Sequence, residues 1–305
     1  MLFLLMPDAK VVAGVNVQQA MTTPFGQYVL SLIAPQDQQI QALATIIGFD
    51  PRRDVTELLV ASTGAPAHYG LALARGNFDP AKITAAAAQA GVASETYAGV
   101  TILEPKLPAA PAAAAAAAGT TPAPPAVGLA FFDSTLAAVG DLTSLKAAID
   151  RRGAPSILPA ALLTQINQWS LSQDAWVVDT APLSSLTPPA GAPKLPGGAQ
   201  LVALQAIQQA AGGVKFGTNV AVTAQARTDT AQNATALAGL LQFAANLAQA
   251  QSAQNATTAA LLKSLTVTAQ GATLNIAITL PQAQLQQLAP PNGATQTQRR
   301  SVRKM

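Results

Sequence analysis

The same series of helix and strand patterns occurs twice along this chain, and this repetition constrains the fold more than any single motif does. Residues 7–15 and residues 173–180 each begin with a polar segment that leads into an apolar, β-branched run. In both halves we then expect a helix, a hairpin, an alanine-rich helix, a second hairpin and a closing helix. Such a repeat is an architectural signal that does not identify a reaction.

The repeat predicts an α+β fold. We expect two tandem β-α-ββ-α-ββ-α repeats with largely antiparallel sheets, each covered by helices on one face. The first repeat is assigned to residues 1–172 and the second to residues 173–290. The remaining residues, 291–305, form a basic tail that we expect to be disordered.

Apolar periodicity and turn signals set the expected elements. In the first half the patterns predict strands at 11–17, 58–62, 69–75, 96–104 and 127–133, and helices at 24–33, 36–47, 81–90, 143–152 and 159–171. In the second half they predict strands at 176–180, 213–216, 220–227, 266–269 and 273–280, and helices at 201–211, 230–249 and 282–288. Asp79 followed by Pro80 is typical of a helix start, because an N-cap carboxylate accepts free backbone N–H groups and proline fits the first turn.

Residues 106–126 have the composition of a linker, with seven consecutive alanines and five prolines. Comparison of the halves gives another interpretation, since the matching position in the second half is the short turn 270–272. We therefore interpret 106–126 as a disordered insertion into one hairpin whose flanking strands stay paired. Residues 187–199, rich in proline and glycine, form a smaller loop of the same kind.

The net charge of +3 comes from the end of the chain. Four of the 17 basic residues lie in the last seven positions, which leaves 13 basic against 14 acidic residues in the body. The body therefore offers no basic face for nucleic acid, and we expect no nucleic-acid partner. No run of about 18 apolar residues is present, so we expect no transmembrane span.

Composition also bears on cofactors and on cellular location. The chain has no cysteine and one histidine, and it lacks phosphate- and dinucleotide-binding glycine motifs, so we expect no cofactor or metal. The lack of cysteine, the uncharged polar residues and the Ala/Pro-rich segment together favour a periplasmic or secreted protein. Residues 1–6 are too short for a signal peptide, which we expect upstream of Met1.

Few residues are candidates for catalysis. His68, at a predicted hairpin turn, has no partner nearby in sequence to make it a general base, and we interpret it as structural or exposed. Asp133 and Asp179 each follow an apolar strand and precede a hydroxyl residue, as in the paired carboxylates of aspartic peptidases. Both lack the glycine that follows in those enzymes, so capping of strand ends is the preferred interpretation.

The densest charge cluster, residues 50–57, alternates in sign. Its arginines, Arg52 and Arg53, together with Arg75, are candidates for contact with an anion or a partner. A solvated loop that pairs its own charges is the alternative.

Two short segments carry a resemblance to a known group of proteins. The stretch Gly-Phe-Asp-Pro-Arg-Arg-Asp-Val at 48–55 and the helix start Thr-Ala-x-x-Ala-x-x-Leu-Ala at 230 resemble exported bacterial proteins of an acidobacterial type, which are uncharacterised. The resemblance covers most of residues 7–289. It implies a location outside the cytoplasm and carries over no activity and no site residues.

These observations favour a non-enzymatic binding or scaffold protein outside the cytoplasm. A rigid framework with few titratable residues would hold a protein partner or an apolar ligand on an uncovered sheet face or between the repeats. The alternative from another class is a carboxylate-based hydrolase that uses Asp133 and Asp179. Assembly into a larger envelope complex is a third possibility, and the oligomeric state stays open.

Overall fold

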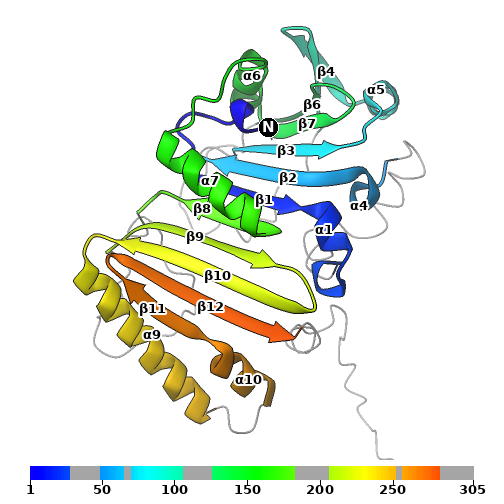
Figure 1. Cartoon of the computed structure of the whole chain (residues 1–305). Helices are drawn as coiled ribbons and strands as arrows, with labels where there is room; N and C mark the ends of the chain where they lie inside the picture. The colour runs from blue at the N-terminus through cyan, green and yellow to red at the C-terminus, as the bar shows by residue number, and fades with distance from the viewer. Residues whose placement is uncertain (28–48, 65–69, 106–125, 183–205, 252–255, 282–305) are drawn as a thin grey trace, which may run out of the picture.

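Twelve strands pair edge to edge in one continuous antiparallel sheet in the computed structural model (Figure 1). The structure describes residues 1–27, 49–64, 70–105, 126–182, 206–251 and 256–281. The strands are β1 (Val11–Asn16), β2 (Val55–Ser62), β3 (Leu71–Gly76), β4 (Ala93–Tyr97), β5 (Val100–Glu104), β6 (Val127–Phe131), β7 (Leu136–Asp141), β8 (Ala175–Asp179), β9 (Ile207–Lys215), β10 (Asn219–Thr228), β11 (Thr266–Gln270) and β12 (Thr273–Pro281). The helical segments are η1 (Leu2–Leu4), α1 (Val17–Met21), α4 (Pro51–Asp54), α5 (Pro80–Gln89), α6 (Leu142–Asp150), α7 (Ala160–Ser172), α9 (Ala231–Gln251) and α10 (Ala256–Ser264).

The strand order places β1 and β8 side by side at the centre of the sheet. The full order is β11-β12-β10-β9-β8-β1-β2-β3-β7-β6-β5-β4. Outward from the centre, β1-β2-β3-β7-β6 on one side matches β8-β9-β10-β12-β11 on the other. Mixed helix and antiparallel sheet confirm the α+β class.

Helices pack on both faces of this sheet, so the expectation of helices on one face is wrong. The α7 face, named here for the helix that covers its centre, also carries α6 and the N-terminal residues (Figure 1). On the opposite face, named the α5 face, α5 packs near β5 and β6, and α9 packs on β11 and β12. Both faces are buried in part because strands such as β2 and β3 carry apolar side chains at successive positions.

The main core lies on the α7 face. Val12, Leu59, Leu73 and Val178 from the central strands are at most 3% exposed and belong to one cluster with residues of α6 and α7. Leu4 and Leu5 are fully buried in the same cluster. The apolar N-terminal residues therefore serve as core. No helix within the described ranges is long and apolar enough to cross a membrane.

Local signals placed several elements correctly. Asp79 is the N-cap of α5, where its carboxylate accepts a hydrogen bond of 3.0 Å from the Lys82 N–H, and Pro80 occupies the first turn. The hairpin β9–β10 turns at residues 216–218, and α9 and the β11–β12 hairpin lie where the periodicity predicts them. The predicted segments 36–47, 187–199 and 282–288, with the tail, lie outside the described residues, as do His68 and residues 106–125.

Two predictions about the strands are wrong, and one strand was missed. Residues 96–104 form no single strand but a hairpin, β4–β5, because Ala98 and Gly99 adopt positive φ angles of 45° and 77° that reverse the chain. Residues 207–211, expected to end a helix, belong to β9, whose pairing with β8 and β10 on its two sides overrides the helical spacing. The strand β7 was not anticipated.

The insertion also has a different counterpart from the one expected. Strands β5 and β6, which flank residues 106–126, pair as predicted through Ile102 with Ala130 and Leu103 with Leu129. By position in the sheet, however, the turn 270–272 corresponds to the β6–β7 turn, since β12 pairs with β10 as β7 pairs with β3. Strands β4 and β5 have no equivalent in the second half among the described residues.

Gly14 allows the central strands to carry a large aromatic side chain. Its cross-strand partner on β8 is Trp176, and a Cβ built at Gly14 would lie 2.6 Å from the indole ring. We predict that Gly14→Ala lowers the free energy of unfolding by about 1–3 kcal/mol, since the packed ring must move. The matched control is Gly239→Ala in α9, where the added Cβ meets open space and should stabilise the helix by roughly 0.5–1 kcal/mol. Chemical denaturation of both variants measures the two effects, and equal shifts would contradict the close contact.

Candidate functional site

A hollow lined only by apolar side chains lies on the α5 face. We call it the apolar hollow, and its volume is about 370 Å³. Its floor is made by β2, β3, β7 and β6, whose directly paired residues form two adjacent rows. The lining residues are Phe49, Val55, Leu58, Ala72, Leu73, Ala74, Phe78, Ile83, Leu129, Phe131, Ala137 and Val139.

The small side chains of the floor explain why the hollow exists. In one row, Leu58 pairs across the sheet with Ala74, which in turn pairs with Ala137. In the next row, Ala72 lies between the larger Val60 and Val139. Because alanine extends only one carbon above a strand, the centre of the floor lies lower than its surroundings.

Aromatic side chains form one wall. Phe78 lies between Phe49 and Phe131, with ring centroids 5.7 Å and 5.6 Å away and the rings tilted by 37° and 58°. These separations fall in the favourable range for aromatic pairs. Ile83 of α5 closes another side of the hollow. The wall is thus built from segments that flank β2, β3 and β6.

Asp54 holds the segment that carries Phe49. Its carboxylate accepts a hydrogen bond of 2.8 Å from the Asp50 N–H and pairs with both Nε and Nη2 of Arg53 at 2.7 Å. The Asp54 carbonyl accepts a hydrogen bond of 2.7 Å from the Asn77 N–H, next to Phe78. The hydrogen bond from Arg53 holds the pKa of Asp54 below its ordinary value.

Apolar side chains continue from the hollow towards the sheet centre. Val139, at the edge of the hollow, is 42% exposed, and Val60 is 45% exposed. The same row then passes through Ala13 to Val177, which is 40% exposed. Exposed valines in one continuous row are unusual in a sheet interior and indicate a surface suited to an apolar ligand.

The candidate arginines have carboxylate partners of their own. Arg53 pairs with Asp54, and Nε of Arg75 lies 3.4 Å from Glu57 on the neighbouring strand. The side chain of Arg52 lies outside the described part of the structure. Self-pairing, the alternative interpretation of this cluster, therefore holds for Arg53 and Arg75, and anion binding stays a prediction.

Asp133 and Asp179 lie far apart, which contradicts the hypothesis of a paired carboxylate site. Asp179 pairs with Val11 at one end of the central strands, whereas the β6–β7 turn with Asp133 lies at the opposite end, next to Gly76. Four strand intervals also separate β8 from β7, so the two carboxylates are more than about 20 Å apart.

Each of these two carboxylates instead stabilises its own turn. Asp133 accepts hydrogen bonds from the N–H and hydroxyl of Thr135 at 2.6 Å and 2.7 Å, and these bonds lower the pKa of Asp133. Asp179 accepts one of 2.7 Å from the Ala181 N–H. This matches the capping role preferred from sequence. Within the described ranges, no group of three or more His, Asp or Glu side chains is arranged to hold a metal ion.

Sequence reasoning missed the apolar hollow, although a signal for it was present. The strands below it read Leu-Leu-Val-Ala, Leu-Ala-Leu-Ala and Leu-Ala-Ala-Val, with no alternation of polar residues. Continuous apolar runs in an antiparallel sheet indicate that both faces are apolar. The floor was therefore readable, but the aromatic wall depends on tertiary packing.

We predict that the hydrogen bonds and the ion pair of the Asp54 carboxylate are sensitive to acid. Because its folded-state pKa lies below the ordinary value, its contribution is complete above that value and is lost as the pH falls through the depressed pKa. At neutral pH Asp54→Asn should lower the Tm by roughly 2–4 °C, and the difference from the parent should vanish in strong acid. Thermal melts from neutral pH down to below about pH 3 measure this.

Glu57→Gln is the control, since the exposed pair with Arg75 should contribute little. A Tm difference for Asp54→Asn that persists unchanged into strong acid would contradict the assigned role.

Comparison with known proteins shows the fold alone. The chain is similar to TP0453: crystal form III matches with a TM-score of 0.58 at 12% identity, covering 93% of this chain and 95% of that chain. Crystal forms IV and I match with TM-scores of 0.55 and 0.53 at 11% identity, covering 94% of this chain and 95% of that chain. No protein-family model matches the chain, and neither does any curated protein.

Proposed function

We propose that this protein is a non-enzymatic binding protein that acts outside the cytoplasm and holds an apolar ligand in the apolar hollow. The carrying observation is the lining, in which all twelve described residues are apolar. The volume of about 370 Å³ falls in the range of small-molecule pockets. A ligand of this size would be an aromatic molecule or part of an acyl chain.

The chemistry of the hollow supports binding over catalysis. Among the residues that the structure describes, its lining has no side chain that transfers a proton, attacks as a nucleophile or binds a metal. Asp54, next to the lining residue Val55, is paired with Arg53. The alternative function, a carboxylate-based hydrolase, has no support in the positions of Asp133 and Asp179.

We further infer that the framework consists of two related units joined at β1 and β8. The matching strand order on the two sides of this pair supports the inference. Strands β4 and β5, with the α5 segment before them, then form an addition to the first unit, and this addition supplies Ile83 to the hollow. Because only the first unit carries this addition, we expect the ligand site on that unit alone.

Filling the hollow should abolish binding without unfolding the protein. We predict that the neutral dye N-phenyl-1-naphthylamine binds with enhanced fluorescence, and that Ala72→Phe weakens its binding at least about tenfold because the ring occupies the floor. The control, Ala93→Phe, changes an exposed alanine of β4 that does not line the hollow, and it should bind like the parent. Equal dye binding by all three proteins, with circular dichroism confirming their folding, would refute the assignment.

Location can be tested independently of ligand binding. We expect the complete gene, expressed in a bacterial host with its natural upstream sequence, to place the protein in the extracytoplasmic fraction. The absence of cysteine, the polar uncharged surface and the resemblance to exported bacterial proteins support this expectation. Recovery with a cytoplasmic marker enzyme would count against it.

A further inference from the structure

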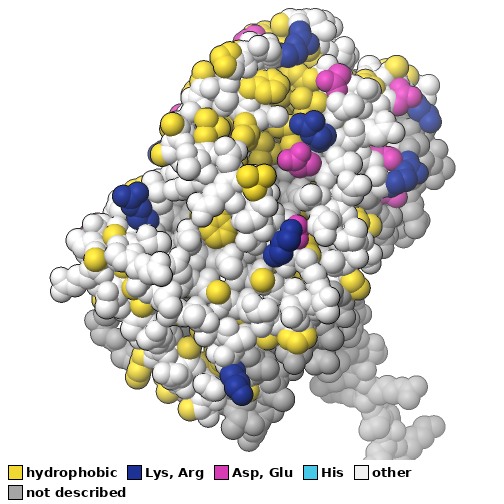
Figure 2. All heavy atoms as spheres, viewed as in Figure 1, with side chains coloured by type: hydrophobic (Ala, Val, Ile, Leu, Met, Phe, Trp, Pro, Cys, Tyr) yellow, Lys and Arg dark blue, Asp and Glu magenta, His cyan; other side chains and the backbone are white. Residues whose placement is uncertain are grey.

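A second concave surface lies on the α7 face, on the other side of the sheet from the apolar hollow. Two adjoining depressions of about 250 and 210 Å³ run beside α7 over β9, β10 and β12. They share Gln168, Trp169 and Gln225, so they form one groove. In Figures 1 and 2 no described helix lies over β10 and β12 on this face, and few charged side chains show there.

Carboxamide side chains dominate this groove, which we call the amide groove. They come from α7 and the residue after it, and from three successive strands. Among the described residues, Arg227 is the one charged residue that lines the groove, and no carboxylate does. The carboxamides belong to Gln165, Gln168, Gln173, Gln209, Gln225 and Asn275.

Three buried polar atoms of the groove lack a hydrogen-bond partner within the protein. They are Oε1 of Gln165, Oε1 of Gln173 and Oγ1 of Thr223. The amide nitrogen of Gln165, by contrast, donates a hydrogen bond of 2.9 Å to Gln209. A buried acceptor without a donor destabilises the protein, so such atoms in a concave surface point to a ligand that completes their hydrogen bonds.

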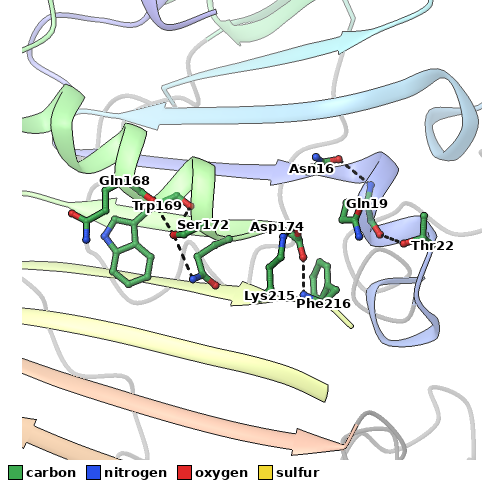
Figure 3. A network of polar contacts seen from close by, with 10 residues as sticks. Asn16, Gln19, Thr22, Gln168, Trp169, Ser172, Asp174, Lys215 and Phe216 are labelled. Atoms are coloured by element: carbon green, nitrogen blue, oxygen red, sulfur yellow. Dashed lines mark hydrogen bonds and ion pairs between the residues drawn. The ribbon is translucent and has the colours of Figure 1, made fainter. Parts of the chain in front are cut away.

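The fold keeps these atoms in place. A Cβ at Gly213 would lie 2.5 Å from Cγ of Gln173, so this glycine gives Gln173 room to lie across β9. Trp169, only 5% exposed, packs between α7 and the sheet (Figure 3). Thr223 sits on β10, paired with Gly213 on one side and Ala277 on the other. The groove therefore presents its polar atoms on rigid elements.

The unpartnered atoms select the class of ligand. Two are carbonyl oxygens that can only accept, so the ligand must donate hydrogen bonds. Phosphate and carboxylate groups supply only acceptors and would leave both oxygens unpartnered. Sugar hydroxyls donate and accept at once, as carboxamides do, and they are closely spaced along a chain. We propose that the amide groove binds a neutral oligosaccharide.

The proposal can be tested with defined sugars on the full chain. The probes are cellotetraose, maltotetraose and tetra-N-acetylchitotetraose. Their binding is measured by calorimetry and by tryptophan fluorescence. At least one should bind saturably with a Kd of about 1 mM or tighter. Thr223→Val and Gln165→Leu should each weaken that binding about five- to tenfold, the effect of one hydrogen bond. Thr223→Val should leave the Tm unchanged, because it removes an unpartnered atom. Gln165→Leu also removes the donor of the hydrogen bond to Gln209, so it should lower the Tm slightly.

Controls separate this site from general effects and from the apolar hollow. Thr101→Val changes an exposed threonine of β5 away from the groove and should bind sugar like the parent. Ala72→Phe, which fills the apolar hollow, should also leave sugar binding unchanged. The proposal is overturned if no probe binds below about 10 mM, if tetragalacturonate binds better than all three neutral probes, or if both groove variants bind like the parent.

Discussion

The pairing of β1 with β8 is the contact on which the rest of the structure depends, because it joins two hairpin systems into one sheet. Its register places Val12, Trp176 and Val178 in the core of the α7 face, and a shift by one residue would turn them outward. Asp174, only 4% exposed, fastens the pair to β9 (Figure 3). Its carbonyl accepts from Asn16 at 2.7 Å, and its carboxylate contacts Lys215 and the Phe216 N–H at 2.6 Å and 2.7 Å.

This central pairing also determines why the two candidate sites lie on opposite faces. In the first half of the sheet, helices α6 and α7 cover the α7 face. Among the described elements, the open surface of this half is therefore the alanine floor on the α5 face. In the second half of the sheet, α9 packs against Val267 and Leu274 on the α5 face, and no described helix covers the α7 face. The residue types agree with this arrangement, since Thr223 and Asn275 line the open face while Leu274 faces α9.

Local chemistry made part of this fold predictable from sequence. The Asp79-Pro80 helix start depends on near neighbours and is confirmed. The pairing of the strands on either side of residues 106–126 is also confirmed, although it joins residues far apart in sequence. Other predictions that depend on distant pairing were wrong, as for residues 207–211, which have helical spacing but lie between two strands. Asp133 and Asp179 looked equivalent in sequence, yet the strand order separates them, so no local pattern could have paired or excluded them.

Five of the carboxylates described in this structure serve the fold, which supports the proposed binding role. Asp79 and Asp141 cap helices, Asp133 and Asp179 close turns, and Asp174 joins three strands. A general acid or base must instead be free to exchange a proton with a substrate. These carboxylates are engaged in contacts that hold the fold. What the two concave surfaces provide for a ligand is their shape, their apolar area and their amide hydrogen bonds.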